Sequence, residues 1–380
     1  MRATDWPAAR GLLIDRRRLL GVLAATGAAV RPGAPNAACR APSLAALAAE
    51  KGLMFGMALT REQVREAPPL VAVALAQAAM LVPGNELKWV RAEPEPGQFD
   101  FADADALVDL AHAHGLLSRG HALVWHEALP AWMGPGLTRA EAGAALSRHI
   151  KTLCSRYAGR MHSWDVVNEA IEPSGAGPLR RTPFLAALGE DYIARAFALA
   201  AEADPDAILT LNEYDLERDT EWQARRRAAM LDLLNRLVRR RVPVRALGVQ
   251  GHLDPAKGRF DPEVFRGFIR AVASLGLSVF ITELDITDRT LPGAVVARDR
   301  AAAEETRAYL AAALAEPAVR LVVTWGVSDA YSWVDGNPRT RRTDGLTSRP
   351  HLYDAAFRPK PLRAAVAEAL RSAPARGIAR

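Results

Sequence analysis

The chain is short of cysteine, of low-complexity sequence and of long hydrophobic runs, and each shortage excludes a class of protein. Its 380 residues include only two cysteines, Cys39 and Cys154, too few for a disulfide-stabilised scaffold. Cys154 is expected to fill core space on a helix instead. After the first forty or so residues there is no low-complexity linker and no evident internal repeat, which argues against several modules and against a solenoid. No apolar stretch is long enough for a membrane-spanning helix. Half of the residues are hydrophobic, which is enough for the core of one large domain.

The N-terminus has the order of an export signal. Arg16, Arg17 and Arg18 precede an apolar stretch at 19–30, and small residues and prolines follow up to about Ala38. This order is typical of a secretory signal, and the adjacent arginines give it a twin-arginine character. We therefore expect residues 1–38 to be removed, residues 39–380 to form the mature domain, and the protein to be exported to the periplasm or the cell exterior.

Two alternatives for the N-terminus stay open. The segment could be an exposed helix of the mature protein, although it lacks the polar face that such a helix needs. A lipid anchor at Cys39 is also conceivable, but Asn36 occupies a position where such sites usually carry a bulky aliphatic residue.

The excess positive charge is concentrated in this leader. The whole chain carries 49 Lys and Arg against 43 Asp and Glu, and the leader accounts for six arginines and two aspartates. The remaining 43 basic and 41 acidic residues give a net charge of about +2. Three arginines stand together at 225–227 and at 239–241, but both runs lie in predicted helices or at their ends with acids nearby, so solvated helix faces are expected. Nucleic-acid binding is therefore not expected.

Eight strand-like segments alternate with helical patterns. The strands are predicted at 53–59, 86–90, 117–125, 163–168, 208–212, 246–251, 279–284 and 321–326, and the helices between them include 101–114 and 191–203. Alternating strands and helices predict a parallel sheet of the α/β class. Eight strands predict a single closed (β/α)8 TIM barrel, whose active site lies at the carboxyl ends of the strands.

Two of these strands run into a glutamate. Glu169 follows the fourth strand in the segment WDVVNEA (164–170), and Glu283 ends the seventh in ITELD (281–285). Glycosidic-bond cleavage requires two carboxyl groups, because one protonates the departing sugar oxygen while the other attacks the anomeric carbon or activates water. A separation of roughly 5 Å selects the retaining route. The barrel is expected to bring both glutamates into one cleft.

Six ordered segments resemble those of glycoside hydrolase family 10, the endo-β-1,4-xylanases. They are NELKW (85–89), GHALVWH (120–126), WDVVNEA (164–170), GVQGH (248–252), ITELD (281–285) and WGVSD (325–329). The resemblance extends from about Leu44 to Leu362 and covers essentially the whole mature chain. One Asn-Glu pair would be a weak signal, whereas six motifs in the family's order are a specific one.

The resemblance implies endo-hydrolysis of β-1,4-xylosidic bonds by a retaining mechanism, without a cofactor or a metal. Glu169 would be the general acid/base and Glu283 the nucleophile, so the first must stay protonated and the second ionised near neutral pH. Asn168 would hold the 2-hydroxyl of the sugar, and His252 would donate a hydrogen bond beside the nucleophile. Asp285 lies two residues beyond Glu283 on the same side of a strand and can orient His252.

The same resemblance implies a set of sugar-binding residues. Polar groups would fix hydroxyls and indole rings would cover pyranose faces. Lys88, one of only five lysines, suits a compact charge at a crowded site. The set comprises Asn85, Glu86, Lys88, His121, Trp125 and His126 on the glycone side, Trp325 and Trp333 over the subsite next to the scissile bond, Tyr214 on the aglycone side, and Asn212 and Gln250 facing the cleft.

Two departures from the family pattern bear on substrate range. Glu127 and Ala128 stand where the family usually shows a small polar residue and a glutamine, so one sugar contact is missing. Asp215 stands where asparagine is more usual, and its charge is expected to repel acidic groups on the polymer or to attract a cation. We predict weaker or shifted binding beyond the central subsites.

Three other functions are alternatives to xylan hydrolysis. A metal-dependent barrel hydrolase would need histidines at the end of the first strand, which reads MFGM. Another barrel glycosidase, cutting β-1,4-glucan or short xylo-oligomers, stays open because two such glutamates serve many sugars. A non-catalytic carbohydrate-binding protein would keep the tryptophans and drop a glutamate, yet both glutamates are present. The expected partner is β-1,4-xylan or xylo-oligosaccharide, and the mature chain is expected to be a monomer.

Overall fold

The computed structural model describes residues 42–173 and 178–377. The predicted export signal and Cys39 therefore lie outside the described residues. One compact unit, Ser43–Arg376, carries all the elements given below. None of the helices in the described ranges is long and apolar enough to cross a membrane.

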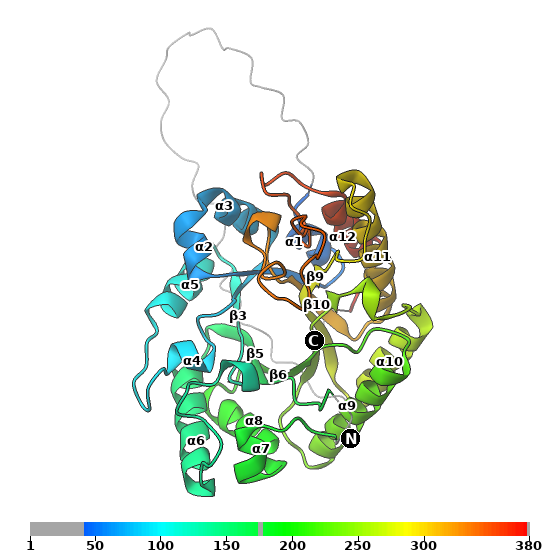
Figure 1. Ribbon diagram of the computed structural model, residues 1–380. Helices are drawn as coiled ribbons and strands as arrows, with labels where there is room; N and C mark the ends of the chain where they lie inside the picture. The colour runs from blue at the N-terminus through cyan, green and yellow to red at the C-terminus, as the bar shows by residue number, and fades with distance from the viewer. Residues whose placement is uncertain (1–41, 174–177, 378–380) are drawn as a thin grey trace, which may run out of the picture. The chain divides into compact units, whose positions relative to one another are not determined.

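Eight parallel strands of the described chain close into a barrel, as predicted (Figure 1). In barrel order they are β1 (Met54–Leu59), β2 (Met80–Pro83), β3 (Leu117–Gly120), β5 (Met161–Asn168), β6 (Ile208–Glu213), β7 (Ala246–Val249), β9 (Ser278–Ile286) and β10 (Val319–Thr324). Strand β10 pairs with both β1 and β9, which closes the circle. The short strands β4 (Val124–Trp125) and β8 (His252–Leu253) add to the carboxyl ends of β5 and β9.

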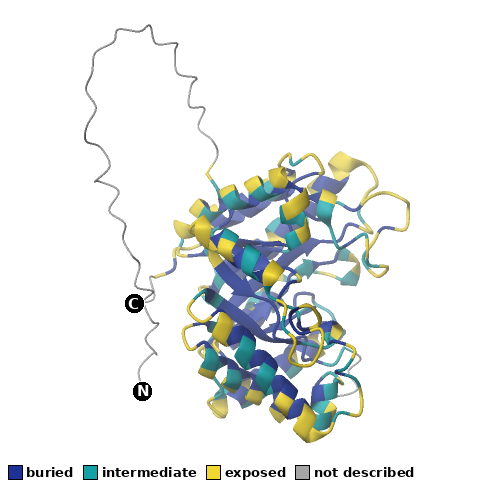
Figure 2. Cartoon of the chain, turned by 90° about the vertical axis from the view of Figure 1, so that its left-hand side faces the viewer, coloured by how far each residue is buried: buried dark blue, intermediate teal, exposed yellow. Residues whose placement is uncertain are grey.

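Helices cover the outside of this barrel, with their exposed faces turned to solvent and the strands buried behind them (Figure 2). Threonine side chains cap several helix starts, and Thr138 forms a reciprocal capping box with Glu141 at the start of α6. The helices are α1 (Leu44–Ala49), α2 (Arg61–Glu66), α3 (Pro68–Gln77), α4 (Trp89–Ala92), α5 (Ala102–Ala113), α6 (Arg139–Arg156), α7 (Pro183–Leu188), α8 (Asp191–Ala203), α9 (Glu221–Arg239), α10 (Pro262–Ser274), α11 (Val295–Ala315) and α12 (Pro361–Ser372).

The core has two parts because successive strand residues face opposite sides of the sheet. Leu321 and Val323 of β10 join Phe280 and Met80 in a small cluster that fills the barrel interior. Val322, between them, packs into the larger cluster between the sheet and the helices. Cys154 on α6 is buried in this larger cluster, as expected.

The predicted second strand, 86–90, is wrong. The strand is β2 (Met80–Pro83), and 86–90 spans a turn and the start of α4. Leu87 and Trp89 are fully buried, so their spacing imitates the alternation of a strand. The predicted strand 117–125 divides into β3 and β4. The other six predicted strands and the helices 101–114 and 191–203 match observed elements with shifts of only a few residues at their ends.

The prediction that the arginines at 225–227 form a solvated helix face is also wrong for two of the three. Arg225 is exposed on α9, but Arg226 and Arg227 are buried. Arg226 pairs with the buried carboxylate of Glu213, whereas Arg227 donates to main-chain oxygens. A helix face that turns towards the barrel carries these two arginines, and their charges are satisfied internally. The second run, 239–241, is exposed as expected.

Candidate active site

One open cleft of about 850 Å³ lies at the carboxyl ends of the strands. This volume lies within the range of about 300–1,000 Å³ that is typical of ligand-binding clefts. Thirteen of the predicted site residues line it, namely Asn85, Lys88, His121, Trp125, Asn168, Glu169, Tyr214, Gln250, His252, Glu283, Asp285, Trp325 and Trp333. Three others, Glu86, His126 and Asn212, stand behind the lining and do not face the cleft.

Glu283 is held as a carboxylate by donors on both of its oxygens. The side-chain amide of Asn212 donates to Oε1 at 2.7 Å, and Nε2 of His252 lies 3.2 Å from Oε2. His121 lies 4.0 Å from Oε1. Burial alone would raise the pKa of Glu283, but His121, His252 and Asn212 together lower it to about 2. Glu283 is therefore ionised throughout the physiological range.

A second carboxylate fixes His252. Nδ1 of the ring lies 2.7 Å from Oδ1 of Asp285, and Oδ2 of Asp285 accepts a hydrogen bond of 2.7 Å from Nε1 of Trp333. Burial lowers the pKa of His252, but Asp285 and Glu283 outweigh it and raise the pKa to about 10. The ring is thus a cation near neutral pH, and both of its nitrogens can donate.

Glu169 has a different environment. It is 9% exposed, its Oε1 accepts a hydrogen bond of 3.1 Å from Gln250, and Nη2 of Arg180 lies 3.8 Å from its Oε2. Burial is the main reason that the pKa of Glu169 is raised, and the negative charge of Glu283 acts in the same direction. Trp125, Gln250 and Arg180 oppose the shift without reversing it. The two glutamates are thereby pushed towards opposite protonation states.

Two amide side chains connect the glutamates. Nδ2 of Asn212 donates to Glu283 and, at 2.9 Å, to Oδ1 of Asn168, whose own Nδ2 lies 3.4 Å from Oε1 of Glu169. The other side of the Asn212 amide accepts a bond of 2.7 Å from Thr282. Gly248 leaves room for this arrangement, since a Cβ there would lie 2.1 Å from Oδ1 of Asn212.

A buried ion pair orients His121. Nδ1 of His121 lies 3.0 Å from Oδ2 of Asp165, whose other oxygen accepts from the guanidinium of Arg119. Arg119 also donates to Ser163 at 2.6 Å, and both members of the pair are about 1% exposed. Ser163 and Asp165 lie two residues apart on β5, and both accept from Arg119, so they share the inward side of the strand. No local pattern identifies Arg119 as their partner.

The part of the cleft lined by Asn85 and Lys88 is organised around Glu86, which does not line it. Its carboxylate accepts backbone N–H bonds from Arg61 at 2.6 Å and from Asn85 at 3.0 Å. Oδ1 of Asn85 then accepts a bond of 2.8 Å from Nζ of Lys88, which lies 5.0 Å from the centre of the Trp125 ring. Burial lowers the pKa of Lys88, an effect that the surrounding glutamates partly offset.

His126 and Asn212 act from behind the cleft surface. Nδ1 of His126 lies 4.0 Å from Oε2 of Glu169. Burial and the charge of Arg180 lower the pKa of His126 to about 4, so the ring is neutral near pH 7. Asn212 is fully buried, so it can affect the cleft only through the groups that it contacts.

Asp215 does not bring a free charge into the cleft. Both of its carboxylate oxygens accept from Nζ of Lys257, at 2.7 and 2.9 Å, and Asp215 is only 5% exposed. Of the two alternatives predicted for Asp215, repulsion of acidic groups or attraction of a cation, the structure agrees with the second, and the cation is a lysine of the same chain. Lys257 lies 42 positions further along the chain, so no local sequence pattern indicates that it pairs with Asp215.

Several other residues of the site were missed. Arg180 does not line the cleft but lies 3.8 Å from Glu169. The cleft itself contains Arg289, which pairs with Asp254 at 2.9 Å. The remaining members that sequence reasoning did not single out include Thr60, Glu62, Gln63, Trp222, Tyr331, Asn337, Arg339 and Thr340. Some of these residues lie on loops and others in the first turns of α2 and α9. They meet at the cleft only because the barrel brings these segments together, so no local pattern identifies them.

One group of side chains within the described residues has the spacing of metal ligands. Atoms of His126, Glu127 and Glu169 lie within 4.8 Å of one another. The guanidinium of Arg180 beside Glu169 places a positive charge against this group, which opposes binding of a cation. We assign no metal to it.

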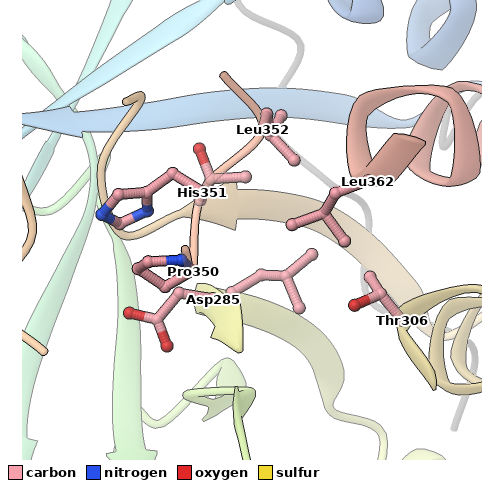
Figure 3. Close-up of a pocket in the computed structure, with 8 residues that line it drawn as sticks. Asp285, Thr306, Pro350, His351, Leu352 and Leu362 are labelled. Carbon is pink, nitrogen blue, oxygen red and sulfur yellow. The ribbon is translucent and has the colours of Figure 1, made fainter. Parts of the chain in front are cut away.

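A second, very small cavity lies behind Asp285 (Figure 3). Its volume is about 10 Å³, which admits nothing larger than a water molecule. His351 lines it, and burial lowers the pKa of this histidine to about 4, so the ring is neutral. The cavity is therefore part of the packing behind the site and not a substrate pocket.

Comparisons with known proteins agree with this geometry. A family model described as "Glycosyl hydrolase family 10" matches residues 43–369. Endo-1,4-beta-xylanase B of Thermotoga neapolitana is 34% identical over 304 residues, which cover 80% of this chain and 84% of that protein. A beta-1,4-xylanase of Dictyoglomus thermophilum is 36% identical over 289 residues, covering 74% and 78%. The crystal structure of xylanase 10B from Thermotoga petrophila RKU-1 in complex with xylobiose superposes with a TM-score of 0.80 at 32% identity, covering 87% of this chain and 98% of that one. With its barrel, its paired glutamates and this match over most of its length, the chain belongs to glycosyl hydrolase family 10.

Proposed function

We propose that the protein hydrolyses internal β-1,4-xylosidic bonds of xylan with retention of configuration, using Glu169 as general acid/base and Glu283 as nucleophile. The observation that carries this proposal is the opposite setting of the two cleft glutamates. Burial raises the pKa of Glu169, while His121, His252 and Asn212 overcome burial and lower that of Glu283 to about 2. An acid that keeps its proton and a nucleophile that keeps its charge are what the first step requires.

In that step the carboxylate of Glu283 attacks the anomeric carbon, and Glu169 gives its proton to the departing glycosidic oxygen. The C–O bond to the leaving sugar breaks, and a glycosyl ester of Glu283 forms. Asn212 and His252 hold the two oxygens of Glu283, so the nucleophile is oriented before substrate arrives. Asn168 faces the cleft between the glutamates, where it would meet the 2-hydroxyl of the sugar.

The second step uses the same residues with the roles reversed. Once Glu283 is esterified, its negative charge no longer contributes to the raised pKa of Glu169. The pKa of Glu169 then falls, so its carboxylate can accept a proton from the water that attacks the anomeric carbon. Hydrolysis of the ester releases the second sugar and restores both side chains.

The choice of xylan as substrate is supported by the relatives. Proteins named as xylanases match 74–80% of this chain, and one related structure is described as a complex with xylobiose. Asn85, Lys88 and His121 would bind hydroxyls on the glycone side, Trp125, Trp325 and Trp333 would cover sugar rings, and Tyr214 would contact the aglycone.

The test compares reducing-sugar release from beechwood xylan and from carboxymethylcellulose. Wild-type protein is expected to act on xylan, Glu283→Ala to lose that activity, and Glu202→Ala, an exposed glutamate on α8, to keep it. NMR of the first product formed from a β-xylobioside should show the β anomer. Release from cellulose alone would assign the chain another substrate, and an initial α anomer would contradict the retaining route.

We also propose that residues 1–38 direct export through a twin-arginine signal. The support is the basic, apolar and small-residue order of that segment. Replacing Arg16, Arg17 and Arg18 by lysine should retain the charge and abolish export. Secretion that continues unchanged would argue against the twin-arginine route.

A further inference from the structure

The proposed acid/base residue has an unusual backbone. The φ angle of Glu169 is +60°, in the left-handed region that side chains other than glycine rarely adopt. Such a conformation persists only where its surroundings hold it, and it often accompanies a residue that must point in one direction.

Hydrogen bonds clamp the main chain on both sides of Glu169. Its N–H donates to the carbonyl of Asn212 at 2.8 Å, and its carbonyl accepts from Nε of Arg180 at 2.8 Å. Two residues further on, the N–H of Ile171 donates to Oε2 of Glu213 at 2.9 Å. The loop after β5 is thus tied to the end of β6, where Glu213 lies.

Glu213 is itself held by Arg226 of α9. Nη2 of Arg226 donates to Oε1 of Glu213 at 2.6 Å and to the carbonyl of Tyr214 at 3.0 Å. The ion pair is almost completely buried, with exposures of 0% for Glu213 and 2% for Arg226. The ring of Tyr214 lies 4.4 Å from the same guanidinium, and its hydroxyl accepts from Arg180 at 2.7 Å. Helix α9, the end of β6 and the loop that carries Glu169 are therefore linked into one polar network.

A contribution to the stability of the fold is a poor explanation for the buried Glu213–Arg226 pair. A buried ion pair loses solvation that its mutual attraction only partly returns, so well-packed apolar residues stabilise a fold as well or better. Neither Glu213 nor Arg226 lines the cleft, so neither touches substrate. What the pair does contact is the segment whose conformation aims the carboxyl group of Glu169.

We propose that the Glu213–Arg226 ion pair positions Glu169 for proton transfer, acting through Ile171 and through the Tyr214–Arg180 contact. The inference rests on the proposed role of Glu169 as acid/base. Glu213 and Arg226 are therefore positioning residues. This role explains why two charges that are costly to bury lie at this place in the fold.

The leaving group of the substrate separates a positioning role from a structural one. Phenolate is a poor leaving group and needs a proton from the acid, whereas 2,4-dinitrophenolate leaves with little help. Loss of acid positioning therefore lowers kcat/KM for phenyl β-xylobioside much more than for 2,4-dinitrophenyl β-xylobioside. A variant that is merely less folded loses the same factor on both substrates.

The experiment measures kcat/KM for these two substrates with the full chain and its Glu213→Gln variant. The selective loss on the phenyl substrate is expected to be roughly 10- to 100-fold. Glu217→Gln is the matched control, since Glu217 is a buried glutamate of the loop that follows β6. Its carboxylate accepts from the N–H of Leu216 and, among the described residues, makes no hydrogen bond to the segment that carries Glu169. If Glu213→Gln does not fold, the double variant Glu213→Gln, Arg226→Met leaves no unpaired buried charge and should show the same selectivity.

The outcomes are distinct. Equal losses on both substrates would overturn the positioning role. Glu169→Gln is measured alongside, and if it too shows no selectivity, the proposed function itself fails. Selectivity in Glu169→Gln that is absent in the Glu213 variants rejects this inference alone.

Discussion

His252 and Asp285 are joined by a contact of 2.7 Å between ring Nδ1 and carboxylate Oδ1, which turns the other ring nitrogen towards Glu283. Asp285 reaches this position because it lies two residues after Glu283 on β9, on the same side of the strand. Because Asp285 keeps His252 charged, it also determines how strongly Glu283, the proposed nucleophile, is held in its ionised form.

Replacing Asp285 by asparagine should change how activity depends on pH. Without the carboxylate, the pKa of His252 falls from about 10 towards 6.5, and the histidine no longer supports the low pKa of Glu283. Because the free enzyme needs Glu283 ionised, the acidic limb of the kcat/KM profile should move to higher pH, by roughly one unit or more. The measurement is kcat/KM for phenyl β-xylobioside against pH. Asp254→Asn, another acidic residue of the cleft, should leave that limb in place.

The same pair predicts how stability depends on pH. The folded-state pKa of His252 lies above its unfolded value of 6.5, so its contribution to the free energy of unfolding is full below pH 6.5 and lost as pH rises through 10. Wild type should therefore exceed His252→Gln in stability most clearly below pH 6.5, with the difference declining towards pH 10. Urea unfolding at pH 6, 8 and 10 measures this difference. A difference that grows with pH would contradict the assignment of a charged His252.

Sequence patterns were sufficient for the barrel and for the centre of the site. Strand-helix alternation predicted the fold, and two glutamates at strand ends predicted where Glu169 and Glu283 meet, because parallel strands bring their carboxyl ends together. The period-2 relation of Glu283 and Asp285 also predicted the partner of His252, which the structure confirms. Such features depend on local periodicity, which one sequence carries in full.

The amide bridge between the glutamates gives a prediction about Gly248. A methyl group at Gly248 would lie 2.1 Å from Oδ1 of Asn212, so Gly248→Ala should push the amide away from Glu283 and Asn168. We expect kcat to fall by about 100-fold or more, as when a preorganised donor is removed, and stability to fall by about 1–3 kcal/mol. Steady-state kinetics and thermal unfolding check both values.

A matched control for that substitution is available in the same chain. Gly267 lies within α10, and a Cβ there meets no atom within 4 Å. Gly267→Ala should leave kcat unchanged and stabilise the protein by about 0.5–1 kcal/mol, because alanine loses less backbone entropy in a helix. Equal kinetic losses in the two variants would show that the amide bridge is not the cause.

The Lys257–Asp215 ion pair leads to a prediction about activity on xylan that carries acidic side groups. It neutralises Asp215 in the cleft, so Lys257→Met should leave a negative charge facing substrate. We expect kcat/KM for a uronic-acid-decorated xylo-oligosaccharide to fall about fivefold relative to the undecorated oligomer, which corresponds to about 1 kcal/mol of repulsion between partly solvated charges. The double variant Lys257→Met, Asp215→Asn should restore the ratio, and a ratio that stays low would place the effect elsewhere.

The missing glutamine beside His126 predicts an effect on distal binding. Ala128 is buried in the turn after β4 and does not line the cleft, whereas its neighbour Glu127 does. Together with Asp215→Asn, Ala128→Gln should change the pattern of products that the enzyme releases from xylohexaose. Identical product patterns for wild type and the double variant would contradict weakened binding beyond the central subsites.

Long-range ion pairs were beyond sequence reasoning. Arg119 with Asp165, Lys257 with Asp215 and Arg226 with Glu213 each join different segments of the barrel. Composition and local spacing carry no information about which segments will meet, so a run of arginines in a predicted helix was assigned to solvent as a whole. Only the folded structure separates the buried members of that run from the exposed one.

Substituting the adjacent residues Arg225 and Arg226 of α9 tests the difference between an exposed and a buried arginine. Arg226 is 2% exposed and pairs with a fully buried carboxylate, so Arg226→Gln leaves Glu213 buried without its counter-charge. We expect a loss of about 3–5 kcal/mol in the free energy of unfolding. Arg225 is exposed and pairs with the exposed Glu221 of the first helical turn, so Arg225→Gln should change stability by about 0.5 kcal/mol or less. Urea unfolding of both variants measures the contrast, and similar losses would mean that the Glu213–Arg226 pair is not a buried contact in solution.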